Sequence, residues 1–217
     1  MHLSALQLNP RHAKAIRSLS DVHEMHSLLW RAFPQRKETS DESQAGRVLY
    51  RIEGLSSLAT LPILVQSEHQ PDWSSLCEMD GLLLKSHSKL FDPQISKGQL
   101  LRFRIRANPT MIKTFPILNG FAEKRRMGIY SEEGQSEWFA RKAEEAGFSP
   151  LDLRFIAAGN LTGKKSGSEG ATKLQFHSVD YEGVLRVTEP ALFLKALENG
   201  IGSGKAFGFG LLSVARA

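Results

Sequence analysis

The sequence predicts an α+β protein built from two tandem ferredoxin-like domains, each with the element order βαββαβ. After residue 98, the segments follow the order strand, helix, strand, strand, helix, strand, with one extra turn or hairpin. The N-terminal half begins in the same way. The stretch 86–98 has the composition of a linker. We therefore expect an N-terminal domain at residues 1–92 and a C-terminal domain at residues 93–217.

Length and composition are those of a globular protein with a basic surface. With 41% hydrophobic residues, the 217-residue chain can bury one or two cores. Its net charge of +5 favours a polyanionic partner, although a solvated, slightly basic surface is the simpler alternative. Cys77 is the only cysteine, which excludes an intrachain disulfide and favours a reducing cytoplasm. The longest apolar runs, such as Leu82-Leu83-Leu84, are too short to cross a bilayer.

The first domain is predicted to open with a strand and a helix. Residues 2–8 alternate imperfectly and end at Asn9-Pro10, and a basic connector follows. Asp21 can cap a helix that runs to about Phe33, with Glu24 returning the bond in a box-like arrangement. The core face of this helix comprises Val22, Met25, Leu29, Ala32 and Phe33, and the opposite side carries His23, His26, Ser27 and Trp30.

Two strands and a short helix complete what we predict for this half. Residues 47–53 and 61–66 are strand-like and are separated by a Gly-Leu-Ser-Ser turn, which predicts a hairpin. A short helix then begins at Asp72 or Ser74. Trp73 is expected in the core or at a hinge rather than as a platform for nucleic-acid bases.

The clearest strand covers residues 101–109 and carries three arginines on one face. Alternation places apolar side chains on the other face, whereas Arg102, Arg104 and Arg106 share one side. Three neighbouring guanidiniums repel one another unless an anion lies over them, and phosphate matches the planar fork of arginine. A solvated edge strand is the alternative, because charged edges discourage aggregation.

The remaining segments of the second domain are predicted from their composition and turns. Residues 110–126 lack a clear period and are expected to be irregular, with four cations against the single acid Glu123: Lys113, Lys124, Arg125 and Arg126. The other predictions are, in order, a helix at 136–146, a strand at 151–158, a flexible loop at 159–172, a strand at 173–181, a turn at 182–183, a strand at 184–187, a helix capped by Thr188 and ended by Gly200, and a closing strand within 207–214.

A glycine-rich loop near the C-terminus is the most distinctive feature of the sequence. Lys205 adds a charge to a segment whose glycines are Gly200, Gly202, Gly204, Gly208 and Gly210. The nucleotide-binding P-loop pattern fails here, because its first glycine is replaced by Asn199 and its hydroxyl residue by Ala206. The short apolar segment after the loop also favours a strand over the helix that a P-loop requires.

The same loop resembles that of a known superfamily of RNA-binding proteins. The pattern glycine, hydrophobic, glycine, five residues, glycine, any residue, glycine is similar to the loop of the CRISPR-associated RAMP superfamily. The closing run Gly-Lys-Ala-Phe-Gly-Phe-Gly-Leu-Leu-Ser-Val resembles the CasE family. Further similar segments are Glu24-Met25-His26, residues 63–68 with Pro71-Asp72-Trp73-Ser74, and the arginine-rich strand through Asn108-Pro109.

This resemblance implies a function and a set of site residues. The CasE family consists of endoribonucleases that cleave CRISPR precursor RNA at the 3′ base of a repeat hairpin and act as a subunit of the Cascade complex. The resemblance assigns His26 as the catalytic histidine, places His23 where relatives can have a tyrosine, and supplies Arg31 as the basic residue five positions later. Expected RNA contacts are Arg102, Arg104, Arg106, Lys113, Lys205 and the arm residues Lys164, Lys165 and Lys173.

The implied chemistry needs no metal or other cofactor. The 2′-hydroxyl of the RNA attacks the adjacent phosphate, with His26 as general acid or base and Arg31 or Lys205 stabilising the charge. Metal binding by His12, His23 and His26 is a weaker alternative, because these histidines lack the i, i+4 spacing of zincins. A different class also stays open, a non-catalytic RAMP-type subunit that only binds RNA.

Overall fold

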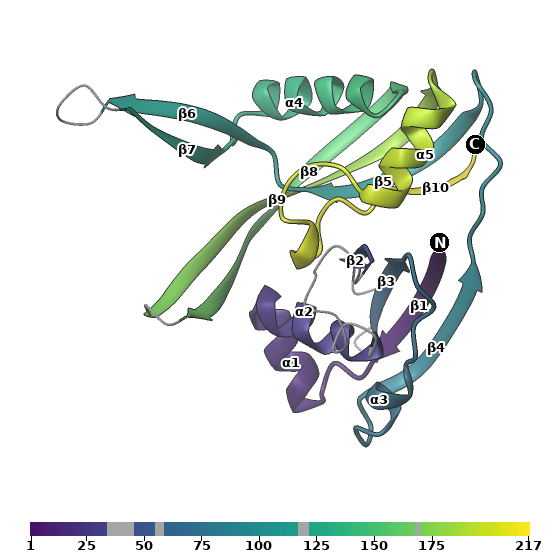
Figure 1. Ribbon diagram of the computed structural model, residues 1–217, viewed down its shortest axis with the longest axis vertical. Helices are drawn as coiled ribbons and strands as arrows, with labels where there is room; N and C mark the ends of the chain where they lie inside the picture. The colour runs from purple at the N-terminus through teal and green to yellow at the C-terminus, as the bar shows by residue number, and fades with distance from the viewer. Residues whose placement is uncertain (34–45, 55–58, 117–121, 168–169) are drawn as a thin grey trace.

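The computed structural model describes the chain except for residues 34–45, 55–58, 117–121 and 168–169. Two four-stranded sheets organise the molecule, and each defines one domain (Figure 1). The first domain contains β1 (His2–Leu8), α1 (Ala13–Ser20), α2 (Val22–Leu29), the 3₁₀ turn η1 (Trp30–Ala32), β2 (Val48–Ile52), β3 (Leu61–Ser67), α3 (Ser74–Cys77) and β4 (Leu83–Leu90).

The second domain repeats this order with an inserted hairpin. Its elements are β5 (Leu100–Ala107), β6 (Thr110–Pro116), β7 (Ala122–Gly128), α4 (Glu132–Glu145), β8 (Phe148–Gly167), β9 (Gly170–Val187), α5 (Pro190–Asn199), the 3₁₀ turn η4 (Lys205–Phe207) and β10 (Ser213–Arg216). Strands β6 and β7 form a separate two-stranded sheet that projects away from the rest of the domain (Figure 1).

The strand orders confirm the predicted pair of ferredoxin-like domains. The first sheet has the order β2-β3-β1-β4 and the second β10-β5-β9-β8, and the pairs in both sheets are antiparallel. Each order places the first and third strands of the βαββαβ unit at the centre of the sheet. The predicted boundary after residue 92 falls between β4 and β5, and we retain it.

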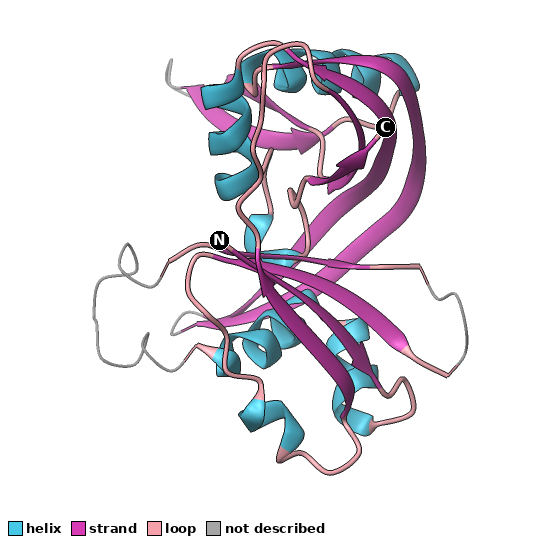
Figure 2. Ribbon diagram, turned by 90° about the vertical axis from the view of Figure 1, so that its right-hand side faces the viewer, coloured by secondary structure: helices cyan, strands magenta, loops and turns pink. Residues whose placement is uncertain are grey.

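Each domain has its own hydrophobic core. In the first, the predicted apolar face of α2 is buried against β1, β2 and β3, with Met25 completely inaccessible to solvent. In the second, the ring of Phe103 on β5 stacks on the ring of Phe139 on α4, with the ring centroids 5.6 Å apart. Figure 2 shows the sheets lying between the helices of the first domain at the bottom and α4 at the top. The sheets thereby hold α2 and the glycine-rich loop near the junction of the two domains.

Several elements of the first domain differ from the sequence prediction. The basic connector is helix α1, whose N-cap His12 accepts a hydrogen bond from the amide of Lys14. Asp21 caps α2 as predicted, but Glu24 forms an ion pair with Lys14 at 2.7 Å instead of closing a capping box. The linker prediction for 86–98 is wrong in part, because residues up to Leu90 belong to β4 and pair with β1.

The second domain contains more strand than the sequence predicted. Of the segment 110–126, residues 110–116 and 122–126 are not irregular but belong to the β6–β7 hairpin, and residues 117–121 lie outside the described part of the chain. The predicted flexible loop at 159–172 is largely occupied by β8 and β9, which extend together as a long arm. The turn predicted at residues 182–183 is absent, because β9 continues through these residues to Val187.

The helices and the closing strand of this domain also have different bounds. Helix α4 begins at Glu132, and α5 has Glu189 rather than Thr188 at its N-cap. The closing strand covers only Ser213–Arg216, since the preceding apolar residues Leu211 and Leu212 pack in the interior without strand pairing. Among the described residues, no helix has the length and apolar character needed to cross a membrane.

Candidate active site

His26 lies on the half-buried face of α2, opposite the side that packs into the first core. Asp21 begins the helix by accepting a hydrogen bond from the amide of His23 at 2.8 Å. One turn after His26, the indole Nε1–H of Trp30 donates to His26 Nδ1 at 2.9 Å. The sequence placed Trp30 on this face but assigned it no role, because a hydrogen bond between side chains four residues apart leaves no mark in the residue pattern.

The hydrogen bond from Trp30 determines which nitrogen of His26 holds a proton. An indole N–H can only donate, so Nδ1 accepts and the neutral imidazole carries its proton on Nε2. A general base needs a lone pair on Nε2, and a general acid needs the doubly protonated ring, so in both roles Nδ1 holds a hydrogen. Either catalytic role therefore requires Trp30 to release Nδ1.

The other residues assigned to catalysis lie at different distances from His26. The imidazole centroids of His23 and His26 are 6.4 Å apart, at a tilt of 50°. Arg31 lies in η1 with an exposed side chain, and its carbonyl accepts a hydrogen bond from Ser75 Oγ. The structure thus groups the two histidines, and the participation of Arg31 stays a prediction.

The glycine-rich loop brings the second domain to His26. The ring of Phe207 in η4 lies 5.9 Å from the ring of His26, and Phe207 also contacts Phe176 of β9. Gly208 has a φ of +88°, and a Cβ there would lie 3.0 Å from the Tyr50 ring. Only glycine adopts this backbone without strain. The loop therefore passes close to the first domain and places an aromatic side chain against the histidine.

Backbone hydrogen bonds fix both ends of this loop. The amide of Ile201 donates to Gly210 O at 2.9 Å, and the amide of Gly210 donates to Arg106 O at 2.8 Å. A Cβ at Gly210 would lie 2.7 Å from Ile201 O, so a side chain there would displace the loop. The loop is consequently anchored on β5, the strand that carries the arginines.

Lys205 is the charged residue of this loop and is half-buried. Desolvation by burial lowers its pKa, and the nearby charges of Arg47 and Lys142 lower it further. A half-buried ammonium close to two other cations is stabilised by an anion, since an opposite charge favours its protonated form.

Two of the three β5 arginines point to the junction between the domains. Arg104 forms ion pairs with Glu53 at 3.0 Å and Asp180 at 3.6 Å, and Arg106 bonds both carboxylate oxygens of Asp180. Arg102 is exposed and donates to the carbonyl of Arg216 at 3.1 Å. The anions over Arg104 and Arg106 are therefore carboxylates of this protein, while the RNA contact predicted for each arginine is untested.

A buried arginine that the sequence did not single out completes this junction. Arg51 of β2 is only 3% exposed and donates to the carbonyls of Arg104 at 2.9 Å and Leu211 at 3.2 Å. It also bonds Glu53 and Ser213 Oγ. Burial lowers the pKa of Arg51, and its bonds to Glu53 oppose that shift. We call Arg51, Arg104 and Arg106 the interface arginines.

The two hairpins carry the remaining predicted RNA contacts. Lys113 is exposed on β6, directly opposite Arg125 of β7. On the arm formed by β8 and β9, Lys164 is paired in register with Lys173, and Lys165 is the next residue of β8, but the side chains there lie outside the described part of the structure. Nearer its root, the arm touches α2, because a Cβ at Gly163 would lie 2.8 Å from Asp21 Oδ1.

The residues that the structure describes contain no group of three or more histidine, cysteine or acidic side chains arranged to hold a metal ion. Of the three histidines considered as metal ligands, His12, His23 and His26, the described structure records a ring contact only between His23 and His26. Independence from metal ions stays a prediction for experiment.

Comparison with known proteins places the chain in a family. A family model described as "CRISPR associated protein" matches residues 1–216. The CRISPR-associated endoribonuclease Cse3 of Thermus thermophilus is 36% identical over 223 residues, covering 99% of this chain and 100% of the relative. The Cascade subunit CasE of Escherichia coli K12 is 28% identical over 199 residues, covering 90% of this chain and 92% of the relative.

Solved structures give the same result. A structure of the endoribonuclease Cse3 bound to a 19-nucleotide RNA has a TM-score of 0.82 and 34% identity, covering 99% of this chain and 100% of that one. Cas6e of Escherichia coli K-12 has a TM-score of 0.70 and 26% identity over the whole of both chains. The fold and site define a ferredoxin-like CRISPR-associated protein. The chain belongs to the CRISPR-associated family that includes Cse3 and CasE.

Proposed function

We propose that this protein is an endoribonuclease that binds the hairpin of a CRISPR repeat and cleaves the precursor RNA at the 3′ base of that hairpin. The observation that carries the proposal is the contact between His26 of α2 and Phe207 of the glycine-rich loop. This contact joins the histidine and the loop that the sequence identified separately. The related Cse3 is named an endoribonuclease and has been solved with RNA bound.

The proposed reaction uses the RNA itself as the nucleophile. The 2′-hydroxyl loses its proton and its oxygen bonds to the adjacent phosphorus, while the bond from phosphorus to the 5′-oxygen breaks and that oxygen gains a proton. The products are a 2′,3′-cyclic phosphate and a 5′-hydroxyl. We assign one of the two proton transfers to His26, an effect of about 10²- to 10⁴-fold in typical enzymes.

Cations near His26 supply the charge stabilisation that this reaction needs. Lys205 lies two residues before Phe207, in the turn that touches the histidine ring. We assign to Lys205 the stabilisation of the phosphorane, because a fixed cation in a half-buried site acts more strongly than one in water. Arg31, five residues after His26, is the second candidate for this role, and His23 is a neighbour of unassigned function.

We assign RNA binding to six cations of the second domain. These are Arg102 on β5, Lys113 on β6, Lys205, and the arm residues Lys164, Lys165 and Lys173. Their phosphate contacts predict a binding constant that falls steeply with salt. We assign Arg104 and Arg106 instead to the domain interface, because Glu53 and Asp180 already neutralise them.

The protein acts as a subunit of a Cascade complex, as its relative CasE is named. We place this function in the cytoplasm, where the exposed thiol of Cys77 stays reduced.

A non-catalytic RNA-binding subunit is the second candidate function. The hydrogen bond from Trp30 favours it, because it holds His26 in a state that serves neither as acid nor as base. The two candidates differ in whether RNA binding leads to release of Nδ1 and to cleavage.

A cleavage assay on the repeat hairpin of the source genome tests the proposal. We expect His26→Ala to abolish cleavage while keeping hairpin affinity, because a proton-transfer group holds little of the substrate. Trp30→Phe is the matched control and should still cleave, since neither proton transfer uses the indole. Loss of both cleavage and affinity in His26→Ala would indicate a structural histidine.

A modified substrate tests the nucleophile independently. RNA with hydrogen in place of the 2′-hydroxyl next to the scissile phosphate should bind normally and stay uncut. Cleavage of this RNA at the normal position would require a water nucleophile and would refute the mechanism. Excess EDTA should leave the cleavage of ordinary RNA unchanged, whereas a requirement for added Mg²⁺ would contradict the proposed chemistry.

A further inference from the structure

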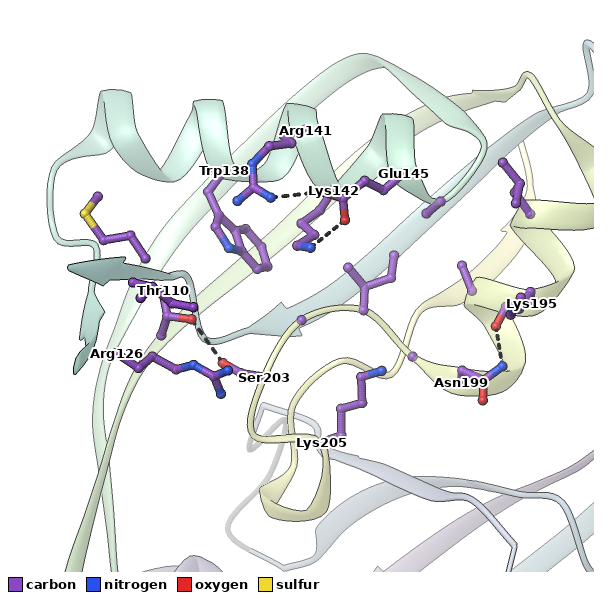
Figure 3. Close-up of a pocket in the computed structure, with 18 residues that line it drawn as sticks. Thr110, Arg126, Trp138, Arg141, Lys142, Glu145, Lys195, Asn199, Ser203 and Lys205 are labelled. Carbon is purple, nitrogen blue, oxygen red and sulfur yellow. Dashed lines mark hydrogen bonds and ion pairs between the residues drawn. The ribbon is translucent and has the colours of Figure 1, made fainter. Parts of the chain in front are cut away.

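A basic pocket lies beside the glycine-rich loop, and of its lining residues only Lys205 has a role in the proposed cleavage step. It has a volume of about 800 Å³ and lies between α4, α5, the base of the β6–β7 hairpin and the loop (Figure 3). Its volume is within the range of pockets that hold small ligands and is too small for a nucleic-acid duplex. The pocket is lined by five cations, which are Arg126, Arg141, Lys142, Lys195 and Lys205.

The charges in this pocket are unbalanced. Glu145 is the single acid among the lining residues, and it already pairs with Arg141 at 2.9 Å and with Lys142. Arg126, Lys195 and Lys205 have no ion pair with a carboxylate in the described part of the chain. In Figure 3, Lys142 extends from α4 and Lys205 from the loop into the same space. Their charges act on each other, and an anion between them would relieve the repulsion.

Apolar surface lies beside these cations. The Trp138 ring lies beneath the pocket and is only 3% exposed, with Gly202 so close that a Cβ there would lie 3.1 Å from the ring. Ile112 of β6 and Leu192 of α5 supply the exposed apolar surface, with exposed fractions of 64% and 46%. A ligand with both phosphates and flat apolar groups, such as single-stranded RNA, fits this combination better than a simple anion.

One turn of chain separates the pocket from His26. Lys205 at the beginning of η4 lines the pocket, and Phe207 at the end of η4 contacts the histidine ring. A polynucleotide strand that left the proposed cleavage site over this turn would reach the pocket. The loop separates the two sites and contributes residues to both.

We propose that this pocket binds the phosphates of a single-stranded RNA segment that flanks the repeat hairpin. The inference rests on the proposed function, because it takes the RNA at His26 as its starting point. Cations from α4, α5 and the loop bind the backbone, and the exposed side chains of Ile112 and Leu192 contact the bases. Such a site ties recognition to single-stranded RNA next to the hairpin as well as to the hairpin itself.

The test measures how much a flank adds to the affinity for the hairpin. The probe is the repeat hairpin of the source genome, ending one nucleotide beyond the scissile phosphate. Hydrogen replaces the 2′-hydroxyl next to that phosphate, so that the probe is not cleaved. Two longer probes carry six unpaired nucleotides on the 5′ side or on the 3′ side. We expect one flank to tighten binding about tenfold and to steepen the salt slope by about 1.4, the value for two single-strand phosphates.

Variants assign this gain to the pocket. The double variant Lys142→Gln/Lys195→Gln removes two pocket charges and leaves Lys205 intact, and we expect it to reduce the gain from the flank to less than about twofold. The matched control Lys85→Gln/Lys89→Gln removes two exposed charges from β4 and should keep the full gain. If the double variant does not fold, Lys195→Gln alone changes an exposed position of α5 and should lose part of the gain.

The outcomes separate this inference from the proposed function. The probe whose flank tightens binding identifies the 5′ or the 3′ side as the occupant. Equal affinity for all three probes, or a gain that persists in the double variant, would overturn the inference and favour an acidic protein segment as the partner. Failure to cleave the hairpin with an intact 2′-hydroxyl would instead overturn the proposed function, whatever the flank contributes.

Discussion

Two groups of cations in this protein have different surroundings. The interface arginines lie between the domains, where Glu53, which directly follows β2, and Asp180 of β9 pair with them. The hairpin cations, which we define as Lys113, Lys124, Arg125 and Arg126, are exposed on β6 and β7. Glu123 pairs with Arg125 at 2.6 Å, and the other three have no recorded ion pair in the described structure.

The difference shows that spacing of cations does not by itself identify a nucleic-acid surface. Alternating arginines on β5 attract any anion that the fold brings opposite them, and here two of them face Glu53 and Asp180. Glu53 comes from the first domain and Asp180 from β9, both distant in sequence from β5. The hairpin cations have few such partners and remain available to an external polyanion.

The largest expected effect is on stability and comes from the most buried interface arginine. Arg51→Leu removes a guanidinium that bonds the carbonyls of Arg104 and Leu211 and the carboxylate of Glu53. We expect the free energy of unfolding to fall by about 3 kcal/mol, because buried partners are left unsatisfied. Chemical denaturation measures the change.

The control is an exposed arginine of β5. Arg102→Leu should change the free energy of unfolding by less than about 0.5 kcal/mol, as surface substitutions generally do. A loss below about 1 kcal/mol in Arg51→Leu would mean that the interface arginines contribute little to holding the domains together.

The second prediction concerns pH and Asp180. Burial raises the pKa of Asp180, but the bond to Arg106 and the charges of Arg106, Arg104 and Arg51 outweigh burial, so the pKa lies below its ordinary value. A carboxyl whose pKa is lowered by folding stabilises the protein above its unfolded pKa of about 3.9 and loses this contribution as the pH falls through the folded pKa. Stability should therefore decrease below about pH 4.

Asp180→Asn identifies this contribution. We expect the variant to lose about 2 kcal/mol at pH 7, the scale of hydrogen bonds to charged groups, and to differ less from the natural protein as the pH falls below 4. Denaturation at several pH values measures both. A difference that stays constant down to pH 2 would show that the charge of Asp180 is not responsible.

The sequence predicted the fold well where elements are buried on one face. Strand β5 has apolar residues at every second position and α2 at helical spacing, and both patterns correspond to buried surfaces. The β6–β7 hairpin and β4 were missed, because strands whose two faces are largely exposed need no apolar alternation. The long arm was predicted as a loop for the same reason, since its composition is polar and rich in glycine.

The candidate site was predicted only in part. His26 and the glycine-rich loop were identified from separate segments, but their contact through Phe207 depends on how the domains pack. In the sequence, Arg51 looks like an ordinary strand residue. The residues next to it do not indicate that its guanidinium donates to the carbonyl of Leu211. Contacts between distant segments determine these roles, and a single sequence does not record them.

The third prediction compares one member of each group in RNA binding. Lys113→Ala should weaken hairpin binding and reduce the salt slope by about 0.7 to 0.9, the loss of one phosphate contact, without changing stability. Arg104→Ala should lower stability and leave the salt slope unchanged, because Glu53 and Asp180 already pair with it. Filter binding at several salt concentrations measures both slopes. Equal slope losses would show that Arg104 also contacts RNA.

The smallest expected effect comes from the exposed ion pair of the hairpin. The bond to Arg125 lowers the pKa of Glu123, and Glu123→Gln removes this charge while keeping the shape of the side chain. Because the pair is solvent-exposed and screened by salt, melting behaviour should be unchanged, in contrast to Asp180→Asn. Arg125 then becomes available to phosphate, so the affinity for the RNA hairpin should rise. The salt slope of RNA binding should steepen by about 0.7 to 0.9. If the affinity for RNA does not rise, Arg125 does not face the RNA, and the RNA-binding surface of the β6–β7 hairpin is limited to its other cations.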